Sequence, residues 1–279
     1  MTGAHPDLTD PSTIPADLDD ADLAVELTRR AAVLAGRMRR AGVSSMRKTS
    51  ISDIVTQADH AAEDLITAAL QRWRPADGIV GEEGTSRPST SGRTWVIDPV
   101  DGTYNFHTGL TWWCSALALR AEPDPVATGA PSAPVLGAIH HVASGDSWVG
   151  GPNLPTRRNG APVARIDDAP LHESVLATYL HPTRLQDPAF AQPWLAMAGQ
   201  AATLRMLGSA SCDLAAVADG VLGVWAQHSL PEWDWLPGQA LVLGAGGATQ
   251  EVTVNGHTWC VAGTPTAVAQ AAARLRGEA

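Results

Sequence analysis

Residues 95–106 limit what this chain can fold into more than any other stretch of its sequence. They read Trp-Val-Ile-Asp-Pro-Val-Asp-Gly-Thr-Tyr-Asn-Phe, so a short apolar run leads into two carboxylates three positions apart. Pro99 restricts the preceding Asp98 to extended backbone, and Gly102 removes side-chain bulk where the backbone turns. The stretch predicts a strand that ends in a turn, with acidic side chains and backbone N–H groups at the turn. That combination suits a hard divalent cation that holds an anion against the N–H groups.

Two further acidic segments accompany this one, which alone would indicate only a turn. Upstream, the paired Glu82 and Glu83 follow an apolar run, and downstream Asp234 lies in a Glu-Trp-Asp-Trp run that leads into the apolar, glycine-rich segment 240–247. In this order the three segments resemble the inositol monophosphatase family of metal-dependent phosphatases. Members of that family carry a Gly-Glu-Glu element, an Asp-Pro-x-Asp-Gly-Thr-x-Asn-Phe element and a late Trp-Asp. The resemblance spans roughly residues 20–275.

Charge and cysteine content narrow the possible partners. The net charge of −10 argues against a nucleic acid or an anionic membrane as a partner bound through charge alone. No apolar stretch approaches membrane-spanning length, so no membrane partner is expected. The three cysteines are far apart and form no Cys-x-x-Cys pair, which is typical of buried thiols in a reducing compartment. We therefore expect a cytoplasmic protein.

The chain is long enough for one large domain or two smaller ones, and we expect three regions. Residues 1–19, rich in proline, acidic and hydroxyl side chains, predict a flexible tail without the basic start and apolar block of a signal peptide. Residues 20–160 begin with amphipathic helices over 23–38 and 62–73 and continue as strands, which predicts a mixed or antiparallel sheet that carries the metal ligands.

From residue 161 to 279 the pattern changes to alternating strands and helices, typical of a smaller α/β half. Stacking the two halves predicts an α/β fold of layered α-β-α-β-α type with the site in the crevice between them. The resemblance implies the same sugar-phosphatase fold. The strands expected here are 174–180, 203–207, 223–227 and 249–254, and the helices are 188–201, 210–220, 234–244 and 266–275.

Four carboxylates are expected to meet in this crevice: Glu82, Asp98, Asp101 and Asp234. Without cations they would repel one another in a partly desolvated site, so the cluster indicates a metal cage, with Mg²⁺ as the natural occupant. Two such ions can stabilise the attacking and leaving oxygens of an in-line displacement. The resemblance implies one ion on Glu82, Asp98 and the Val100 carbonyl, a second on the three aspartates, and a third held by Glu82 and water.

A metal-activated water is the expected nucleophile. The resemblance assigns catalytic roles to Glu82, Thr103 and Asp98, and gives the phosphate to the backbone N–H groups of Gly102 and Thr103. Gln227 stands where many family members carry an acidic side chain that accepts hydrogen bonds from substrate hydroxyls. Because Gln both accepts and donates, polyol binding is kept while discrimination shifts. The residues expected to contact substrate are Gly102, Thr103, Ser209, Gln227 and Asp234.

Lys48 is the one lysine among the nineteen Lys and Arg residues. The family has a mobile loop with a lysine followed by Asp-x-Val-Thr-x-x-Asp, and this chain carries the same pattern through Asp53 and Asp59. The resemblance implies that these three residues support the metal ligands. Asp59 also suits the start of its own helix, and Glu83 either supports the site or is a surface glutamate.

The sequence therefore predicts a Mg²⁺-dependent phosphomonoesterase, an inositol-phosphate phosphatase that acts on a small phosphorylated polyol. Histidinol phosphate, fructose bisphosphate and a 3′-phosphoadenosine nucleotide remain open as substrates, although no adenine-binding signature is evident. A regulatory binding protein with secondary catalysis is the alternative from another class. The resemblance further implies inhibition by Li⁺, a homodimer, and two or three Mg²⁺ ions.

Overall fold

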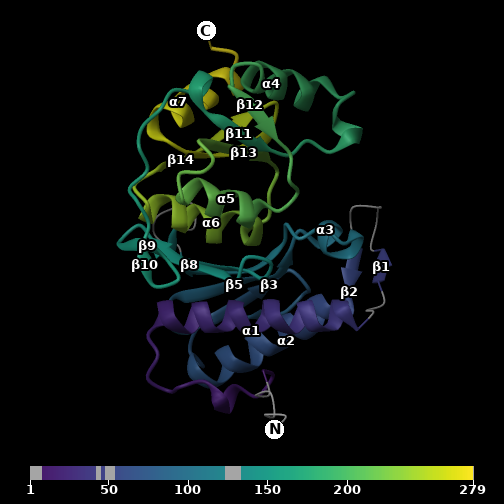
Figure 1. The fold of residues 1–279 in the computed structure, drawn as a ribbon, viewed down its shortest axis with the longest axis vertical. Helices are drawn as coiled ribbons and strands as arrows, with labels where there is room; N and C mark the ends of the chain where they lie inside the picture. Colours follow the sequence, from purple (N-terminus) through teal and green to yellow (C-terminus); the bar gives the residue numbers. More distant parts are fainter. Residues whose placement is uncertain (1–7, 42–44, 48–53, 123–132, 279) are drawn as a thin grey trace.

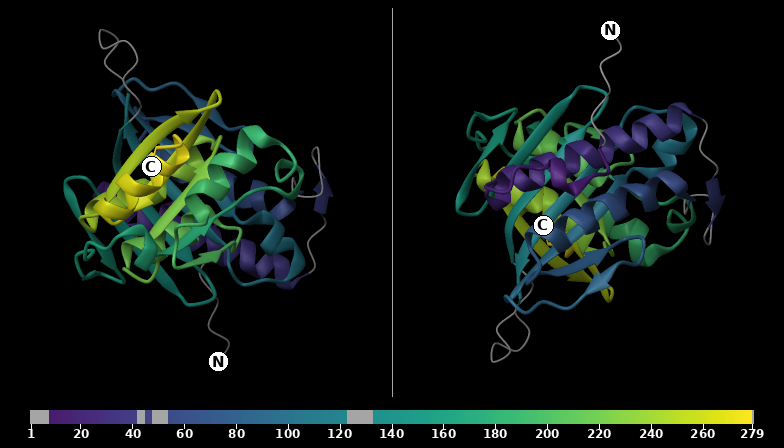
Figure 2. Two further views of the ribbon diagram at one scale, coloured as in Figure 1. Left: turned by 90° about the horizontal axis from the view of Figure 1, so that it is seen from above. Right: turned by 90° about the horizontal axis from the view of Figure 1, so that it is seen from below.

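The computed structural model describes residues 8–41, 45–47, 54–122 and 133–278. In this part of the chain, two β-sheets and three pairs of helices stack into five layers (Figure 1). The layers are, in order, α1 (Asp20–Arg40) with α2 (Gln57–Trp73), an eight-stranded sheet, α5 (Ala210–Ala218) with α6 (Glu232–Gly244), a five-stranded sheet, and α4 (Pro188–Ala198) with α7 (Pro265–Leu275). Figure 2 shows α4 and α7 over one end and α1 and α2 over the other. The α-β-α-β-α order and the α/β class expected from the sequence are confirmed.

The first sheet places the ends of β3 and β5 side by side. Its order is β10-β9-β8-β7-β6-β5-β3-β4, and its pairs are antiparallel except for the parallel pair β3 and β5. Because these two strands run parallel, the residues that follow them emerge at one edge. The strands are β3 (Gly78–Gly81), β4 (Ser86–Arg87), β5 (Arg93–Asp101), β6 (Cys114–Ala121), β7 (Pro134–His141), β8 (Asp146–Gly151), β9 (Leu154–Arg158) and β10 (Ala161–Pro162).

The second sheet has the order β12-β11-β13-β15-β14, with β11 parallel to β12 and β13, and β15 antiparallel to its neighbours. The sequence predicted every strand of it except β15, which follows β14 through a turn in which Asn255 and Gly256 both have positive φ. Asn-Gly is the dipeptide that such a two-residue hairpin favours. The strands are β11 (Val175–Thr178), β12 (Thr203–Arg205), β13 (Val224–His228), β14 (Ala248–Val254) and β15 (His257–Gly263).

Shorter elements complete the described chain. β1 (Ser45–Arg47) and β2 (Ile54–Thr56) pair antiparallel, α3 (Thr103–Thr108) follows β5, and three 3₁₀ turns lie at η1 (Pro11–Thr13), η2 (Leu171–Glu173) and η3 (Pro182–Arg184). None of the helices among these residues combines the length and apolar character that a membrane crossing needs. The predicted domain boundaries after residues 19 and 160 remain a prediction.

Three large apolar clusters fill the four helix–sheet junctions: one lies between α1 and α2 and the first sheet, one surrounds α5 and α6 on both faces, and one lies beneath α4 and α7. Alternation along β5 divides its residues between two of them: Val96 packs toward α5 and α6, whereas Ile97 packs toward α1 and α2. The third lies between the five-stranded sheet and the pair α4 and α7. Helix pair α5 and α6 is therefore covered on both faces and belongs to both halves.

Helix α6 lies unusually close to β7. A Cβ on Gly137 of β7 would stand 2.2 Å from the Pro237 carbonyl oxygen, and a Cβ on Gly238 would stand 2.3 Å from Leu214 in α5. Glycine at both positions permits this approach. The predicted helix 234–244 would place Pro237 in its first turn, but α6 begins at Glu232. The proline is therefore the sixth residue and removes one backbone hydrogen bond from the helix.

From Leu8 onward, the segment that we expected to be a flexible tail packs on α1 and α2. Leu8 and Ile14 are buried in the core beneath these helices. The Trp73 indole N–H donates to the Pro11 carbonyl (3.2 Å), and Arg30 donates to the Thr13 hydroxyl (2.6 Å). Proline and polar content indicated the absence of regular structure but missed the two apolar anchors.

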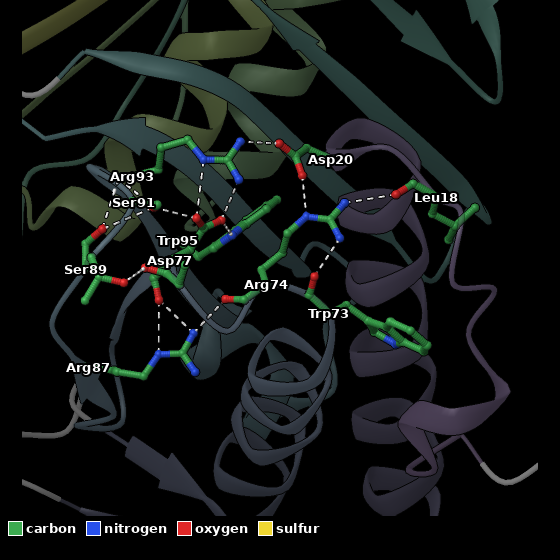
Figure 3. Close-up of polar contacts among 12 residues, drawn as sticks. Leu18, Asp20, Trp73, Arg74, Asp77, Arg87, Ser89, Ser91, Arg93 and Trp95 are labelled. Atoms are coloured by element: carbon green, nitrogen blue, oxygen red, sulfur yellow. Dashed lines mark hydrogen bonds and ion pairs between the residues drawn. The ribbon is translucent and has the colours of Figure 1, made fainter.

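A polar network around the buried Asp77 joins α1, the end of α2 and β5 at the amino end of β5 (Figure 3). The Asp77 carboxylate accepts from the Trp95 indole N–H (2.9 Å) and from Arg93 (2.8 Å). Arg93 and Arg74 both donate to Asp20 in the first turn of α1. This end of β5 is thereby fixed, and the acidic residues of the predicted site lie at its other end.

Candidate active site

A cavity of about 630 Å³ opens at the carboxyl ends of β3 and β5, facing α5 and α6. Both halves of the chain contribute to its walls. From the first half come Glu82, Asp98, Val100, Asp101, Gly102, Thr103, Tyr104, Asn105 and Leu110, and from the second come Tyr179, His181, Pro182, Met206, Leu207, Gly208, Ser209, Ala210, Asp213, Gln227 and Asp234. Nine predicted metal, catalytic and substrate residues therefore line one cavity, drawn from segments more than 100 positions apart.

A β-bulge turns the two aspartates of the central motif toward the same side. Asp98 pairs with Ala116 and Asp101 with Cys114, so β5 takes three steps where β6 takes two. In a regular strand, residues three apart face opposite sides, and one extra residue restores a common face. Pro99 suits this place because it has no N–H to give to the ladder. The Ser115 hydroxyl of β6 donates to the Pro99 carbonyl.

The turn after β5 requires a glycine. Gly102 has a φ of 90°, and a Cβ there would stand 3.1 Å from both the Trp112 carbonyl oxygen and the Ser209 Cβ. Helix α3 then begins at Thr103, whose hydroxyl donates to the Val100 carbonyl (3.0 Å). The first N–H groups of the helix have no acceptor within it, and Gly102 and Thr103 line the cavity, so these groups are available as donors for an anion.

The second half meets this turn through the start of α5. The Ala210 N–H donates to Oδ1 of Asp101 (3.2 Å), and the Ser211 N–H donates to Oδ2. Ser209 caps the helix by accepting from the Cys212 N–H (3.3 Å). Asp101 therefore binds the positive end of a helix dipole from the other half of the molecule.

Asn105 and Asp213 hold the walls of the cavity together, and the sequence reasoning missed both. The Asn105 amide donates to the carbonyls of Trp112 (2.8 Å) and Leu207 (2.7 Å), and the Trp112 indole N–H donates to Asp213 (2.8 Å). Asp213 is buried, and its burial together with the Asp101 charge raises its pKa to about 8. An acidic residue in the otherwise apolar stretch 210–218 was the signal that could have found it.

The carboxylates of the cavity raise one another's pKa. Burial, followed by the charges of Glu82, Asp101 and Asp234, holds the pKa of Asp98 well above its usual range. Burial and the Asp101 charge raise the pKa of Asp234 to about 7. Burial also raises the pKa of Asp101, although hydrogen bonds from the start of α5 oppose the rise. A positive charge in their midst would relieve this repulsion.

These residues fit a magnesium site. Among the described residues, Asp98 Oδ1 is buried and accepts no hydrogen bond, so this oxygen is free to coordinate a cation. No three described His, Cys, Asp or Glu side chains already surround one point as ligands. Mg²⁺ does not require that, since it binds through one or two carboxylates and keeps several waters. The oxygen-only donor set and the mutual repulsion of the carboxylates favour such a hard cation.

The remaining predicted residues lie outside the cavity walls. Asp59 is fully buried in the first turn of α2, and its charge contributes to the raised pKa of Asp98, so it lies near the ligands. The Glu83 side chain is only 3% exposed and stands 3.6 Å from the His60 ring, so it is not a surface glutamate. Lys48 and Asp53 lie outside the described residues.

Comparison with known proteins identifies relatives along almost the whole chain. The model of the inositol monophosphatase family matches residues 18–277. An inositol-1-monophosphatase of Mycobacterium leprae is 33% identical over 237 residues, which cover 82% of this chain and 79% of that protein. A histidinol-phosphatase of Mycobacterium tuberculosis is 31% identical over 233 residues, which cover 82% and 86%.

A solved structure shares the fold. The Thermotoga maritima IMPase superposes with a TM-score of 0.78 over 93% of this chain and 98% of that chain, at 23% sequence identity. The five-layered arrangement is thus found in a solved protein of almost the same extent. The match to the family model and the identity to the mycobacterial relatives show that this chain belongs to the inositol monophosphatase family.

Proposed function

We propose that this family phosphatase is a Mg²⁺-dependent phosphomonoesterase that acts on a small phosphorylated alcohol, with inositol monophosphate as the first candidate. The observation that carries the proposal is the meeting of Glu82, Asp98, Asp101 and Asp234 in one cavity beside the first turn of α3. Carboxylates alone would repel a phosphate ester, so a cation has to stand between them. The relatives named as inositol-1-monophosphatase and histidinol-phosphatase support this class of substrate.

Each residue has a role in the proposed reaction. Glu82, Asp98, Asp101, Asp234 and the Val100 carbonyl hold the ions, which when bound supply a water of lowered pKa and neutralise the phosphate charge. The Gly102 and Thr103 N–H groups bind the phosphate oxygens. The Thr103 hydroxyl, held by Val100, and Glu82 orient and deprotonate the attacking water. Ser209 and Gln227 contact the alcohol.

The first experiment measures phosphate release from inositol monophosphate with Mg²⁺ and after exhaustive chelation. We expect activity only with Mg²⁺, and inhibition by millimolar Li⁺. Asp101→Asn and Asp234→Asn each remove a ligand charge and are expected to lower kcat at least about 100-fold for every substrate. Undiminished turnover in chelator would contradict the proposed mechanism.

The second experiment separates metal binding from specificity. Gln227→Glu replaces a donor and acceptor by an acceptor-only carboxylate, so the ranking of inositol phosphate, histidinol phosphate and fructose bisphosphate should change while the Mg²⁺ requirement stays. Equal scaling of all three rates would remove Gln227 from the alcohol site.

We also infer a homodimer, on the resemblance alone, and a cytoplasmic location, on the three separate cysteines. Sedimentation equilibrium of the purified chain measures its mass in solution. A monomer at working concentrations would end the dimer proposal and leave the catalytic one intact.

A further inference from the structure

The mouth of the catalytic cavity is apolar and aromatic. Both tyrosines of the chain, Tyr104 and Tyr179, line it, together with Leu110 and Met206. Tyr104, Leu110 and Met206 are 45%, 58% and 48% exposed, so three large apolar side chains meet water around one opening. Exposed apolar side chains gathered at a cavity mark a surface that a ligand covers.

Four separate segments bring these side chains together. Tyr104 lies in α3, Leu110 in the loop after it, Tyr179 directly after β11, and Met206 directly after β12. Tyr104 raises the pKa of Tyr179, after burial as the larger cause, which indicates that the two phenols are near each other. The Asn105 amide fixes both sides of this wall, since it donates to the loop at Trp112 and to the turn at Leu207.

Asp98, Asp101 and Asp213 are at most 6% exposed, so these acidic groups lie deeper in the cavity than the exposed apolar side chains. The carboxylates and the start of α3 surround the position proposed for the phosphate, so the alcohol half of a bound ester extends toward the mouth. There the side chains of Leu110 and Met206 offer a hydroxyl no hydrogen-bond partner, whereas an apolar group that covers them removes their exposed surface from water. An aromatic ring would instead stack against tyrosine rings and contact the methionine sulfur.

We propose that the alcohol half of the preferred substrate carries an aromatic ring, bound among Tyr104, Leu110, Tyr179 and Met206. This inference rests on the proposed phosphatase function and deepens it by naming the substrate class. Under this inference an aromatic phosphate ester takes the place of inositol monophosphate as the first candidate substrate, and the polyol phosphates are poorer substrates of the same metal site.

The test compares three phosphate esters of primary alcohols: 2-phenylethyl phosphate, 2-cyclohexylethyl phosphate and glycerol 1-phosphate, with inositol 1-phosphate as the reference polyol. With Mg²⁺, we expect kcat/KM for the phenyl ester to exceed that of either polyol ester at least about tenfold. The kcat/KM of the phenyl ester should also exceed that of the cyclohexyl ester, because only the phenyl ring is aromatic. A polyol ester that is turned over as fast as the phenyl ester, or a cyclohexyl ester equal to it, overturns the proposal.

Variants locate the preference. Met206→Ser and Leu110→Ser should each reduce the ratio of phenyl to glycerol ester severalfold. Leu195→Ser is the matched control, because Leu195 is 61% exposed and lies on α4, outside the cavity lining. It should leave the ratio and the rates unchanged. A ratio that stays constant in both mouth variants contradicts the proposed location.

A binding measurement separates this inference from the proposed function. Saturation-transfer NMR without metal should detect 2-phenylethanol on the protein but not inositol, and the signal should fall in Met206→Ser. If no ester is hydrolysed while 2-phenylethanol still binds in this manner, the phosphatase proposal fails and the aromatic site stands. If the esters are hydrolysed and 2-phenylethanol does not bind, the aromatic site fails alone.

Discussion

At the scale of single residues, the sequence motifs predicted the acidic side chains of the cavity because most of these carboxylates lie in one short stretch or follow a strand end. Asp98 and Asp101 lie in one short stretch, and Glu82 follows the strand parallel to theirs. The residues at the cavity mouth, and those whose hydrogen bonds hold its walls together, could not be predicted this way. Tyr179, Met206 and Asp213 reach the cavity only because their segments pack against segments about 70 to 110 positions earlier in the chain. The hydrogen bond from Trp112 to Asp213 is an example.

Asp213 gives a prediction about pH. Its pKa of about 8 in the folded protein lies far above its ordinary value, so between about pH 4 and pH 8 the folded protein holds a proton that the unfolded chain has released. The contribution of Asp213 to the free energy of unfolding is therefore at its maximum below about pH 4 and is lost as the pH rises to about 8.

In the metal-free protein, Asp213→Asn should thus flatten the fall of unfolding free energy with pH by about 1.4 kcal/mol per pH unit. The amide oxygen can still accept from Trp112, which keeps the geometry. Urea unfolding at pH 5, 6 and 7 measures the slope. Asp22→Asn is the control, since that side chain is 60% exposed. An unchanged slope in Asp213→Asn would show that Asp213 is ionised in the fold.

At the scale of elements, strand and helix positions followed the apolar periodicity, and the differences have local causes. β15 was missed because the chain reverses through only two residues, and α6 begins earlier than expected because Glu232 and Trp233 already have helical backbone. What the pattern could not show is how closely α6 approaches β7. That distance depends on Gly137 and Gly238, which carry no apolar signal.

Gly137→Ala tests this contact. The new Cβ would stand 2.2 Å from the Pro237 carbonyl oxygen, so α6 has to move away from β7 and take Asp234 with it. We expect a loss of about 1–3 kcal/mol in unfolding free energy and a lower kcat. Gly36→Ala is the control, because its Cβ would have no neighbour nearer than 3.6 Å. Because Gly36 lies inside helix α1, Gly36→Ala should raise the unfolding free energy by about 0.5–1 kcal/mol. Equal stability of the two variants, by urea unfolding, would show that the helix has room.

At the scale of the whole molecule, the halves are joined beside the candidate site itself. Asp101 accepts from the start of α5, and Asn105 and Trp112 donate across the same boundary. Ions bound among the four carboxylates would act on this junction as well as on the substrate. The sequence predicted the crevice from the change of pattern near residue 160, but not which bonds cross it.

Mg²⁺ should therefore raise the melting temperature of the protein. An ion that binds only the folded state adds about 2.7 kcal/mol at 100 times its Kd, which corresponds to roughly 5 °C or more for a chain of this size. The rise should be larger at pH 8 than at pH 6, because protons compete for Asp98 and Asp234, whose pKa values are raised. Differential scanning fluorimetry measures both. Asp98→Asn should abolish the rise, and an equal rise in that variant would place the ion elsewhere.

The network around Asp77 also bears on the order in which the protein is made (Figure 3). All of its members lie between Leu18 and Trp95, so it can assemble while the ribosome is still translating the middle of the chain. The opposite face of the same sheet waits for α5 and α6, which are synthesised after residue 209. A nascent chain that has passed β10 but not yet reached α5 would therefore carry one covered and one uncovered sheet face. Until α5 and α6 are made, that apolar face is the surface on which the nascent chain is most prone to aggregate.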